Sequence, residues 1–493
     1  MSHFNWLVDG SIVGLYLLIT MAAGLYVRKY VGKVEHFLVA GREMNVYLGI
    51  ASLAATEFGI VTCMYTAQNG YKYGFAGATP GILMAAAMFI IGKTGFVIKP
   101  LRDSGAITIP ELIEKRFGGR IRWAAGVVIV LGGLLNMGVF LRVGGEFLVL
   151  VSGMDVRYLE IMMTVLLVGV AVYTILGGML SVLVTDFLQF VVMSVGLIAV
   201  TVLILVNVGW DRIVNTVETV QGAGGFNPFV NSEMGVPYVL FNALLNFAAV
   251  LTWQTTIARV LAAKDAKTGQ KVYTRTSFFF VCRFLIPGIW GIAALALLGN
   301  VDNSLEAMPR MLLLIVPTGL MGILLAAMLA ADMSTDSSYM LTWGSVIYND
   351  ILAPFRRGKQ WSERKGLFIN RSIIAGIGIF LLLYGLWYPL KGDLWTYLGV
   401  TGTIYLASIS VILIASCYWE RANSWGAAAS IIVSAALPAA YLVIEQLDGT
   451  KELAKSIGPY YSGIATYVLS ALGMIVGSYL KPQKQLVEAT ENV

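Results

Sequence analysis

The sequence predicts an all-α integral membrane protein, and three observations carry that prediction. Hydrophobic residues make up 58% of the 493 residues, and charged residues only 13%. Soluble domains average about a quarter charged residues, so these charges are too few to cover the two or three soluble domains expected at this length. Apolar runs of about 20 residues, long enough to cross a bilayer, recur along the whole chain. The basic residues lie in short clusters between these runs, which argues against nucleic acid as a partner despite the net charge of +6.

Thirteen such runs can be placed, with connections too short for a soluble domain. In order they cover residues 7–27, 45–69, 77–98, 123–152, 157–176, 179–208, 236–260, 275–299, 311–346, 369–389, 393–418, 424–445 and 459–480. The loops on one side of these spans contain 25 lysines and arginines, and those on the other side contain 7. Cytoplasmic loops carry the basic excess, so we expect the N-terminus outside and the C-terminus in the cytoplasm.

Ionisable residues inside the spans mark candidate functional positions, because a charge at mid-membrane costs at least ~2.5–3.5 kcal/mol. The polar residues that the bilayer penalises are Glu57, Arg142, Glu146, Asp186, Gln254, Arg283, Asp332 and Asp336. Each must face the interior of the bundle or a wet cavity. For Glu146, Arg283 and Asp336, structural ion pairs between helices explain the sequence equally well.

The ninth span carries the densest group of hydroxyl side chains, with four in the five positions 334–338. At 100° per residue, one helical face collects Ala331, Ser334, Thr335 and Ser338, with Ser337 at its margin. Asp332 and Asp336 point the other way. Hydroxyl oxygens and freed backbone carbonyls form the kind of cage that a hard cation such as Na⁺ prefers. The alternative is that these hydroxyls allow close helix packing and bond to carbonyls of their own helix.

Two spans contain polar interruptions that predict unwound turns. In the second span, Glu57 and Gly59 lie among threonines, which weakens the helix and would free the carbonyls of Ala55 and Phe58. The seventh span has its counterpart in residues 252–256. Interrupted helices at corresponding positions of two halves point to a transporter binding site. Spans two to six and seven to eleven would be those halves.

Four segments resemble one known family. They are residues 36–42, the Tyr-Thr-Ile-Leu-Gly-Gly-Met-Leu-Ser motif of 173–181 with Thr185, Asp186 and Gln189, residues 259–264, and Met333-Ser-Thr with the downstream Asn349-Asp350. With the thirteen spans, they resemble the sodium/solute symporters, which include the sodium/proline, sodium/galactose and sialic acid transporters. The resemblance covers roughly residues 35 to 355.

The resemblance implies a five-plus-five inverted-repeat core with alternating access to a midplane site, one extra N-terminal helix and two extra C-terminal helices. The expected parts are 1–44 for the extra helix and a cytoplasmic loop, 45–208 for the first repeat, 209–235 for an extracellular loop, 236–418 for the second repeat, and 419–493 for the last two helices and a short tail. We expect the protein in the bilayer of a bacterial inner membrane, functional as a monomer.

The resemblance also implies two sodium sites, and so two sodium ions per cycle. The first would comprise the carbonyls of Ala55, Phe58 and Ala331 with the hydroxyls of Ser334 and Thr335. The second would use Asp186, Ser334, Ser337 and Ser338. The solute pocket would include Glu57, Thr62, Thr66, Gly81, Arg142, Trp253 and Gln254. Pro80 and Gly81 depart from the sialic acid transporters, whereas Arg283 resembles a basic position of the galactose transporters.

These features predict a sodium-coupled secondary active symporter that imports a small polar organic solute, and not an enzyme. A zwitterion such as an amino acid fits Glu57 and Arg142 best, although Glu57 could instead tune the sodium site or pair with Arg142. A sugar or an organic acid also fits. The alternative is a passive facilitator, a channel or a membrane receptor of the same fold, but the sequence contains neither a filter motif nor an output domain. An intramembrane enzyme would have only Asp332 and Asp336 as a candidate dyad.

Overall fold

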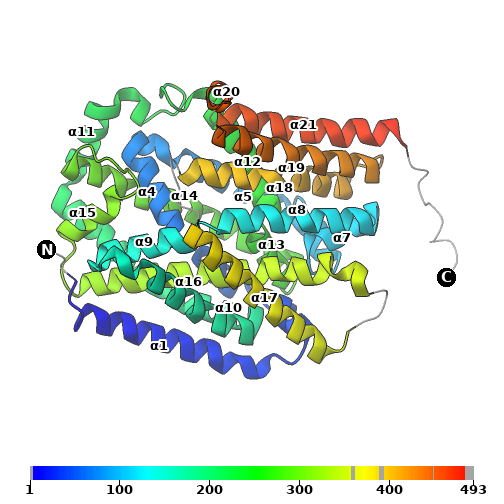
Figure 1. Ribbon diagram of the computed structural model, residues 1–493, viewed down its shortest axis with the longest axis horizontal. Coiled ribbons are helices and arrows are strands. Elements are labelled where there is room, and N and C mark those ends of the chain that lie inside the picture. Colours follow the sequence, from blue (N-terminus) through cyan, green and yellow to red (C-terminus); the bar gives the residue numbers. More distant parts are fainter. Residues whose placement is uncertain (1–3, 357–360, 388–393, 448, 483–493) are drawn as a thin grey trace.

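The computed structural model describes residues 4–356, 361–387, 394–447 and 449–482, and within these the chain forms a bundle of helices (Figure 1). The longer helices are α1 Asp9–Val27, α3 Val46–Thr56, α4 Ile60–Tyr73, α5 Thr79–Thr94, α8 Gly119–Met137, α9 Phe140–Ser152, α10 Leu159–Val208, α12 Gly235–Thr252, α14 Ala266–Leu298, α16 Leu320–Val346, α17 Glu363–Trp387, α18 Leu394–Tyr418, α19 Ser424–Gln446 and α21 Pro459–Leu480. Shorter helices are α2 Val34–Val39, α6 Ile98–Asp103, α7 Ile109–Phe117, α11 Trp210–Gln221, α13 Gln254–Ala262, α15 Ala307–Ile315 and α20 Lys451–Ile457.

Eleven helical stretches in the described part of the chain are long and apolar enough to cross a membrane, where the sequence predicts thirteen spans. Two of the eleven stretches each contain parts of two predicted spans. Ile60–Thr94 contains both α4 and α5, and Val156–Val208 contains all of α10. The apolar, helical character of the protein is therefore established, and the number of crossings depends on how these two stretches lie in the bilayer.

Helix α10 bends sharply at Gly178, where the sequence predicts a turn between two spans. Gly178 has φ +54° and ψ −149°, and a Cβ there would lie 2.6 Å from the Phe37 carbonyl oxygen. Only glycine combines this backbone with this contact. Both arms then pack against α16, because the Tyr173 hydroxyl donates to the Met333 carbonyl at 3.0 Å and the Ser334 hydroxyl donates to Asp186 at 2.5 Å.

Both predicted helix interruptions are confirmed. Residues 57–59 separate α3 from α4, and Gly59 has an extended backbone with ψ 174°. Trp253 alone separates α12 from α13, with ψ 115°. Because an extended residue breaks the helical hydrogen-bond ladder, each interruption leaves backbone groups without a helical partner at the centre of the bundle.

The predicted ninth span, 311–346, is wrong as one continuous helix. α15 ends at Ile315 and α16 begins at Leu320, because Pro317 and the left-handed Gly319 (φ +88°) interrupt the helix between them. The buried carboxylate of Asp9 accepts the backbone N–H groups of Gly319 and Gly322, each at 2.7 Å. The first helix therefore caps the start of α16.

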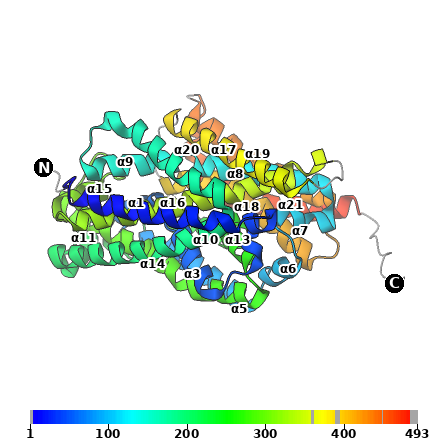
Figure 2. The same cartoon turned by 90° about the horizontal axis from the view of Figure 1, so that it is seen from below.

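Helix α16 lies at the centre of the bundle, with every residue buried except Leu320 and Ile323. Helix α1 packs along α10 and α16 on the outside, as Figure 2 shows. Because α16 has hardly any lipid-facing surface, its polar side chains meet other helices or a cavity.

Candidate functional site

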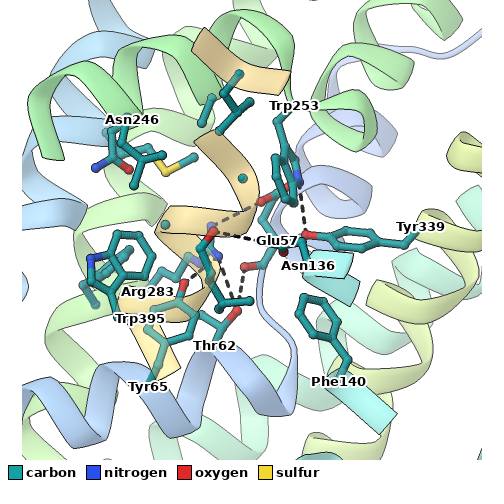
Figure 3. Close-up of a pocket in the computed structure, with 18 residues that line it drawn as sticks. Glu57, Thr62, Tyr65, Asn136, Phe140, Asn246, Trp253, Arg283, Tyr339 and Trp395 are labelled. Atoms are coloured by element: carbon teal, nitrogen blue, oxygen red, sulfur yellow. Dashed lines mark hydrogen bonds and ion pairs between the residues drawn. The ribbon is translucent and has the colours of Figure 1, made fainter. Parts of the chain in front are cut away.

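A cavity of about 80 Å³ lies beside the two helix interruptions (Figure 3). Its polar lining comprises Glu57, Thr62, Tyr65, Asn136, Asn246, Trp253, Arg283 and Tyr339. Its apolar lining includes Met84, Phe140, Leu245, Ala249, Phe284, Trp395, Leu398, Gly399, Gly402 and Leu406. These residues come from eight helices besides the two interruptions, so only the folded bundle forms the cavity.

An ion pair lies in the cavity wall. Arg283 on α14 donates from Nη1 to Glu57 Oε2 at 3.2 Å, and the hydroxyls of Thr255 and Thr256 donate to Glu57 Oε1 at 2.8 and 3.0 Å. Arg283 Nη2 donates to the Tyr65 hydroxyl at 2.8 Å, while the buried Arg283 Nε has no partner in the described residues. The pair is electrically neutral as a unit and leaves one donor free.

Aromatic rings form much of the remaining wall. Trp253 donates from Nε1 to the Tyr339 hydroxyl at 3.0 Å, which joins the α12–α13 interruption to α16. The rings of Tyr65 and Trp395 lie 5.0 Å apart between centroids. A cavity with aromatic walls and a few fixed polar groups is typical of sites for small organic ligands.

Three of the seven predicted solute residues line this cavity: Glu57, Thr62 and Trp253. Thr66, one turn from Thr62, donates its hydroxyl back to the Thr62 carbonyl at 2.7 Å. Gly81 packs against Phe284, whose Cβ would lie 2.7 Å from a Cβ at position 81. These two residues support the wall from behind, without lining the cavity.

The other two predicted residues also lie outside this cavity. Gln254 begins α13 and is buried, with Oε1 unpartnered among the described residues. Arg142 pairs with Glu146 on its own helix at 2.9 Å and lines a different cavity, which also contains Glu306 and Arg310. Glu57 therefore pairs with Arg283 and not with Arg142.

Sequence reasoning missed most of the lining, because seven aromatic or polar residues occur within otherwise ordinary apolar helices. They are Tyr65, Asn136, Phe140, Asn246, Phe284, Tyr339 and Trp395. The clearest available signal was Arg283, which the sequence marks as a charge inside a span. Its partner, Glu57, could be identified only from the way α14 packs against α4.

Thr335 of the predicted first sodium site meets α3 at the α3–α4 interruption. The Thr335 hydroxyl donates to the carbonyls of Thr56 at 2.9 Å and Ala331 at 3.0 Å, and a Cβ at Gly59 would lie 2.8 Å from it. The Ala55 carbonyl accepts the Phe58 N–H at 3.3 Å within the same turn. Carbonyl and hydroxyl oxygens from α3 and α16 thus meet, as a hard cation requires.

The predicted second sodium site contains a guanidinium group. Arg259 on α13 donates from Nη2 to Asp186 at 3.0 Å and to the Ser338 hydroxyl at 2.6 Å, and both charged side chains are completely buried. Asp186 also accepts from Ser52 and Ser334, each at 2.5 Å. Ser337 instead donates to the Ser334 carbonyl at 3.1 Å. Arg259 therefore already supplies a positive charge that balances the buried Asp186 carboxylate.

Arg259, Ser52 and Thr56 are the members of this cluster that sequence analysis missed. Arg259 donates to the Thr56 hydroxyl at 2.5 Å and to the Ser52 hydroxyl at 3.0 Å. Ser52 and Thr56 lie one turn apart on α3, and Arg259 lies close to a run of basic residues that the sequence places in a loop. We name Ser52, Thr56, Asp186, Arg259, Ser334 and Ser338 the Asp186 cluster. It connects α3, α10, α13 and α16.

Asp332 and Asp336 lie on the other face of α16, as predicted, and both are buried. Within the described residues neither carboxyl group makes a hydrogen bond or an ion pair, and a Cβ at Gly144 of α9 would lie 3.2 Å from both Asp332 oxygens. They do not face the oxygens gathered around Thr335.

The profile of the sodium:solute symporter family matches residues 37–434. The chain belongs to this family. The match begins before α3 and ends in α19, so it includes both helix interruptions, the cavity and the Asp186 cluster. Family members are transporters and not enzymes, and sodium symport across a membrane is the family's activity.

Curated relatives extend the match over nearly the whole chain. Sodium/glucose cotransporter 4 of Danio rerio is 26% identical over 98% of this chain and 80% of its own length. Sodium/myo-inositol cotransporter 2 of Homo sapiens is 26% identical over 97% of this chain and 78% of its own length.

Solved structures show the same fold. An outward-open, Na⁺-coupled sialic acid symporter aligns with 97% of this chain and 99% of its own, with a TM-score of 0.80 and 18% identity. MhsT, in complex with L-phenylalanine, aligns with 89% of this chain and 98% of its own, with a TM-score of 0.52 and 15% identity.

Proposed function

We propose that this member of the family couples sodium entry to the uptake of a small neutral polyhydroxylated solute, such as a hexose or a cyclitol, bound in the cavity. The observation that carries this proposal is the Glu57–Arg283 pair in an aromatic wall. Since the two charges satisfy one another at 3.2 Å, the cavity presents hydroxyl, amide and N–H groups without a net charge. Hydroxyl groups of a sugar match such donors and acceptors, and aromatic rings match its C–H faces.

The sequence favours a zwitterion on the premise that Glu57 and Arg142 share a pocket. In the structure Arg142 lines another cavity and pairs with Glu146, so it is not available beside Glu57 to bind the carboxylate of a zwitterion. An amino acid would have to compete with the existing Glu57–Arg283 pair. The glucose and myo-inositol cotransporters among the relatives support the sugar or cyclitol alternative.

Sodium binding at the α3–α4 interruption would provide the coupling. Oxygens of α3 and α16 would share one cation near Thr335, directly beside the start of the cavity at Glu57. A cation bound there would hold α3, α4 and α16 in one arrangement and so favour solute binding, because coupling requires both ligands to prefer the same conformation. Each charge that moves down 100 mV contributes about 2.3 kcal/mol to the drive.

We further propose thirteen crossings, with the N-terminus outside and the C-terminus in the cytoplasm. The bends within Ile60–Thr94 and Val156–Val208 would each divide one apolar stretch into two crossings. The basic excess of the alternate loops supports the orientation. The second sodium ion remains a prediction, and it would have to share Asp186 with Arg259.

Thermal unfolding of the detergent-purified protein tests this function. A ligand that binds only the folded state raises its stability by mass action. We expect a higher unfolding temperature in Na⁺ than in K⁺ at equal ionic strength, and a further rise with a hexose or a cyclitol but not with amino acids. Stabilisation by an amino acid alone would contradict the proposed solute, and equal values in Na⁺ and K⁺ would contradict sodium coupling.

A matched pair of α16 variants localises the ion. Thr335→Ala removes a hydroxyl that reaches the α3 carbonyl, whereas Thr342→Ala removes one whose bonds stay within its own helix, to Ser338 at 2.8 Å and Tyr339 at 3.3 Å. We expect only Thr335→Ala to diminish the sodium-specific stabilisation. Equal sodium responses of the two variants would place the ion elsewhere.

A further inference from the structure

The aromatic wall of the cavity includes a closed triangle of rings from three helices. Tyr65 of α4, Phe284 of α14 and Trp395 of α18 have centroid separations of 5.0, 5.5 and 5.7 Å. All three line the cavity. Their contacts keep α4, α14 and α18 together at this level of the bundle.

Gln68 lies one helical turn beyond Tyr65 on α4, and its amide makes hydrogen bonds to the turn before α15 and to the start of α18. Its Nε2 donates to the Ser304 hydroxyl at 3.0 Å, and its Oε1 accepts the Leu394 N–H at 3.3 Å. Leu394 is the first residue of α18 and directly precedes Trp395. An N–H at the start of a helix has no acceptor within that helix, so the buried Gln68 amide supplies one.

Hydrogen bonds also hold the end of α4 beyond Gln68 against the segment that follows α14. The Tyr71 hydroxyl donates to the Gly299 carbonyl at 2.8 Å and accepts the Val301 N–H at 2.9 Å. Figure 1 shows that α4 and α15 lie toward the end of the bundle that carries the N-terminus. A layer of neutral hydrogen bonds therefore lies between the ring triangle and that end.

We propose that Gln68 is the latch of a gate at the N-terminal end of the solute cavity. Its amide holds the start of α18 against α4 and thereby positions Trp395 against Tyr65. When α4 and α18 separate, the Gln68–Leu394 hydrogen bond and the Tyr65–Trp395 contact break together, and the cavity opens on this side. Water can replace neutral hydrogen bonds at a modest net cost, whereas separating a buried ion pair costs far more, so an amide suits a contact that must open in every cycle.

Gln68 does not line the cavity, so it acts by positioning residues that do. This inference rests on the proposed transport function, because only a carrier needs the cavity to open. It assigns to Gln68 the equilibrium between a closed and an open arrangement, and not the recognition of sodium or solute.

Side-specific labelling of a cavity cysteine tests the latch. The reporter is Thr62→Cys, in a protein in which Cys63, Cys282 and Cys417 are replaced by serine. A membrane-impermeant thiol reagent is applied to right-side-out and to inverted vesicles. We expect Gln68→Leu to raise the labelling rate about tenfold from the side of the N-terminus only, as expected for the loss of two hydrogen bonds.

One further variant and one control complete the test. Ser304→Ala removes the hydroxyl oxygen that accepts the Gln68 Nε2 hydrogen bond and leaves the Gln68 amide less firmly oriented, so it should raise the rate by a smaller factor, even if Gln68→Leu folds poorly. Gln270→Leu makes the same change on α14 near Gly95 and should leave the rate unchanged. Rates that are unchanged in both latch variants, or raised equally from both sides, would overturn the proposal.

Transport kinetics provide a second readout. If closure of the gate is required in each cycle, Gln68→Leu should lower kcat for solute uptake while KM stays the same or falls, whereas damage to the cavity would raise KM. A raised KM would contradict the latch. The sodium-specific rise in unfolding temperature, measured on the parent protein, tests symport separately. A missing rise combined with faster labelling would overturn the symport and support the latch.

Discussion

Two buried ion pairs, Glu57–Arg283 and Asp186–Arg259, occupy adjoining regions of the bundle and use the same chemistry. In the Asp186 cluster both side chains are fully covered, and every oxygen of the carboxylate has a donor. In the cavity pair, Arg283 keeps an N–H group without a partner in the described residues, and both side chains border open space.

This difference indicates that the Asp186–Arg259 pair has a structural role, whereas the Glu57–Arg283 pair is part of a binding surface. A charge pair with all its hydrogen bonds satisfied can add no ligand without breaking a contact, so the Asp186 cluster fixes four elements relative to one another. The Glu57–Arg283 pair borders the cavity, where a ligand can approach it without separating the two charges. Because both pairs are buried, burial alone would not show which of the two borders a binding site.

The largest effect is expected from breaking the Asp186 cluster. Arg259→Ala leaves the Asp186 carboxylate buried without its cation, which typically costs ~3–5 kcal/mol of stability. The unfolding temperature of the purified protein measures the loss. The double variant Asp186→Ala with Arg259→Ala removes both charges and should recover much of it. Failure to recover would mean that Asp186 has another partner, such as a sodium ion.

Neutralising the cavity pair should affect solute more than stability. Glu57→Gln keeps the shape of the side chain but leaves Arg283 without its carboxylate, at a cost of ~1–3 kcal/mol because the cavity admits water. We expect KM for the solute to rise about tenfold or more, measured as sodium-driven uptake into proteoliposomes. The control is Glu146→Gln, which breaks the Arg142 pair outside this cavity. A KM shift of equal size in the control would remove the distinction between the two regions.

Ser334 connects the two regions, because its hydroxyl donates to Asp186 and is also a predicted ligand of both sodium sites. Ser334→Ala loses a hydrogen bond to a charged group, worth ~1.5–3 kcal/mol. We expect the sodium concentration for half-maximal uptake to rise roughly tenfold if Ser334 binds the ion. Thr342→Ala, whose hydroxyl bonds the Ser338 carbonyl of its own helix at 2.8 Å, serves as the comparison. Lower stability with unchanged sodium dependence would assign Ser334 to the ion pair alone.

Replacing an exposed carboxylate, Asp265, should give the smallest loss of stability, with which the losses at the buried carboxylates can be compared. Asp265 precedes α14 and accepts the Thr268 N–H at 2.6 Å, and this backbone bond lowers the pKa of Asp265 below its ordinary value. Asp265→Ala should cost ~0.5–2 kcal/mol, as for other helix caps. Because the folded-state pKa is the lower one, this stabilisation is complete above the unfolded-state pKa and disappears as pH falls through the folded-state value. Unfolding measured between pH 7 and pH 3 should show the variant and parent converging, and a constant difference would contradict the cap.

Much of the architecture could be predicted from the residues alone. The interruptions around Glu57 and Trp253, the turn at Gly178 and the hydroxyl face of α16 all follow from local composition and helical periodicity. The continuous ninth span failed for a local reason as well, since Pro317 and Gly319 end one helix and start another. Such features depend on a few neighbouring residues, which a single sequence displays.

The sequence by itself determined that this chain crosses a membrane, where its helices are interrupted and which face of α16 carries oxygen ligands. Only the tertiary structure decided which charges meet. Glu57 pairs with Arg283 and not with Arg142, although Arg142 is nearer along the chain, and Asp186 meets Arg259 from the end of the predicted seventh span. The physical reason is that periodicity fixes the face of a helix on which a side chain lies, whereas the partner on that face depends on how several helices pack together.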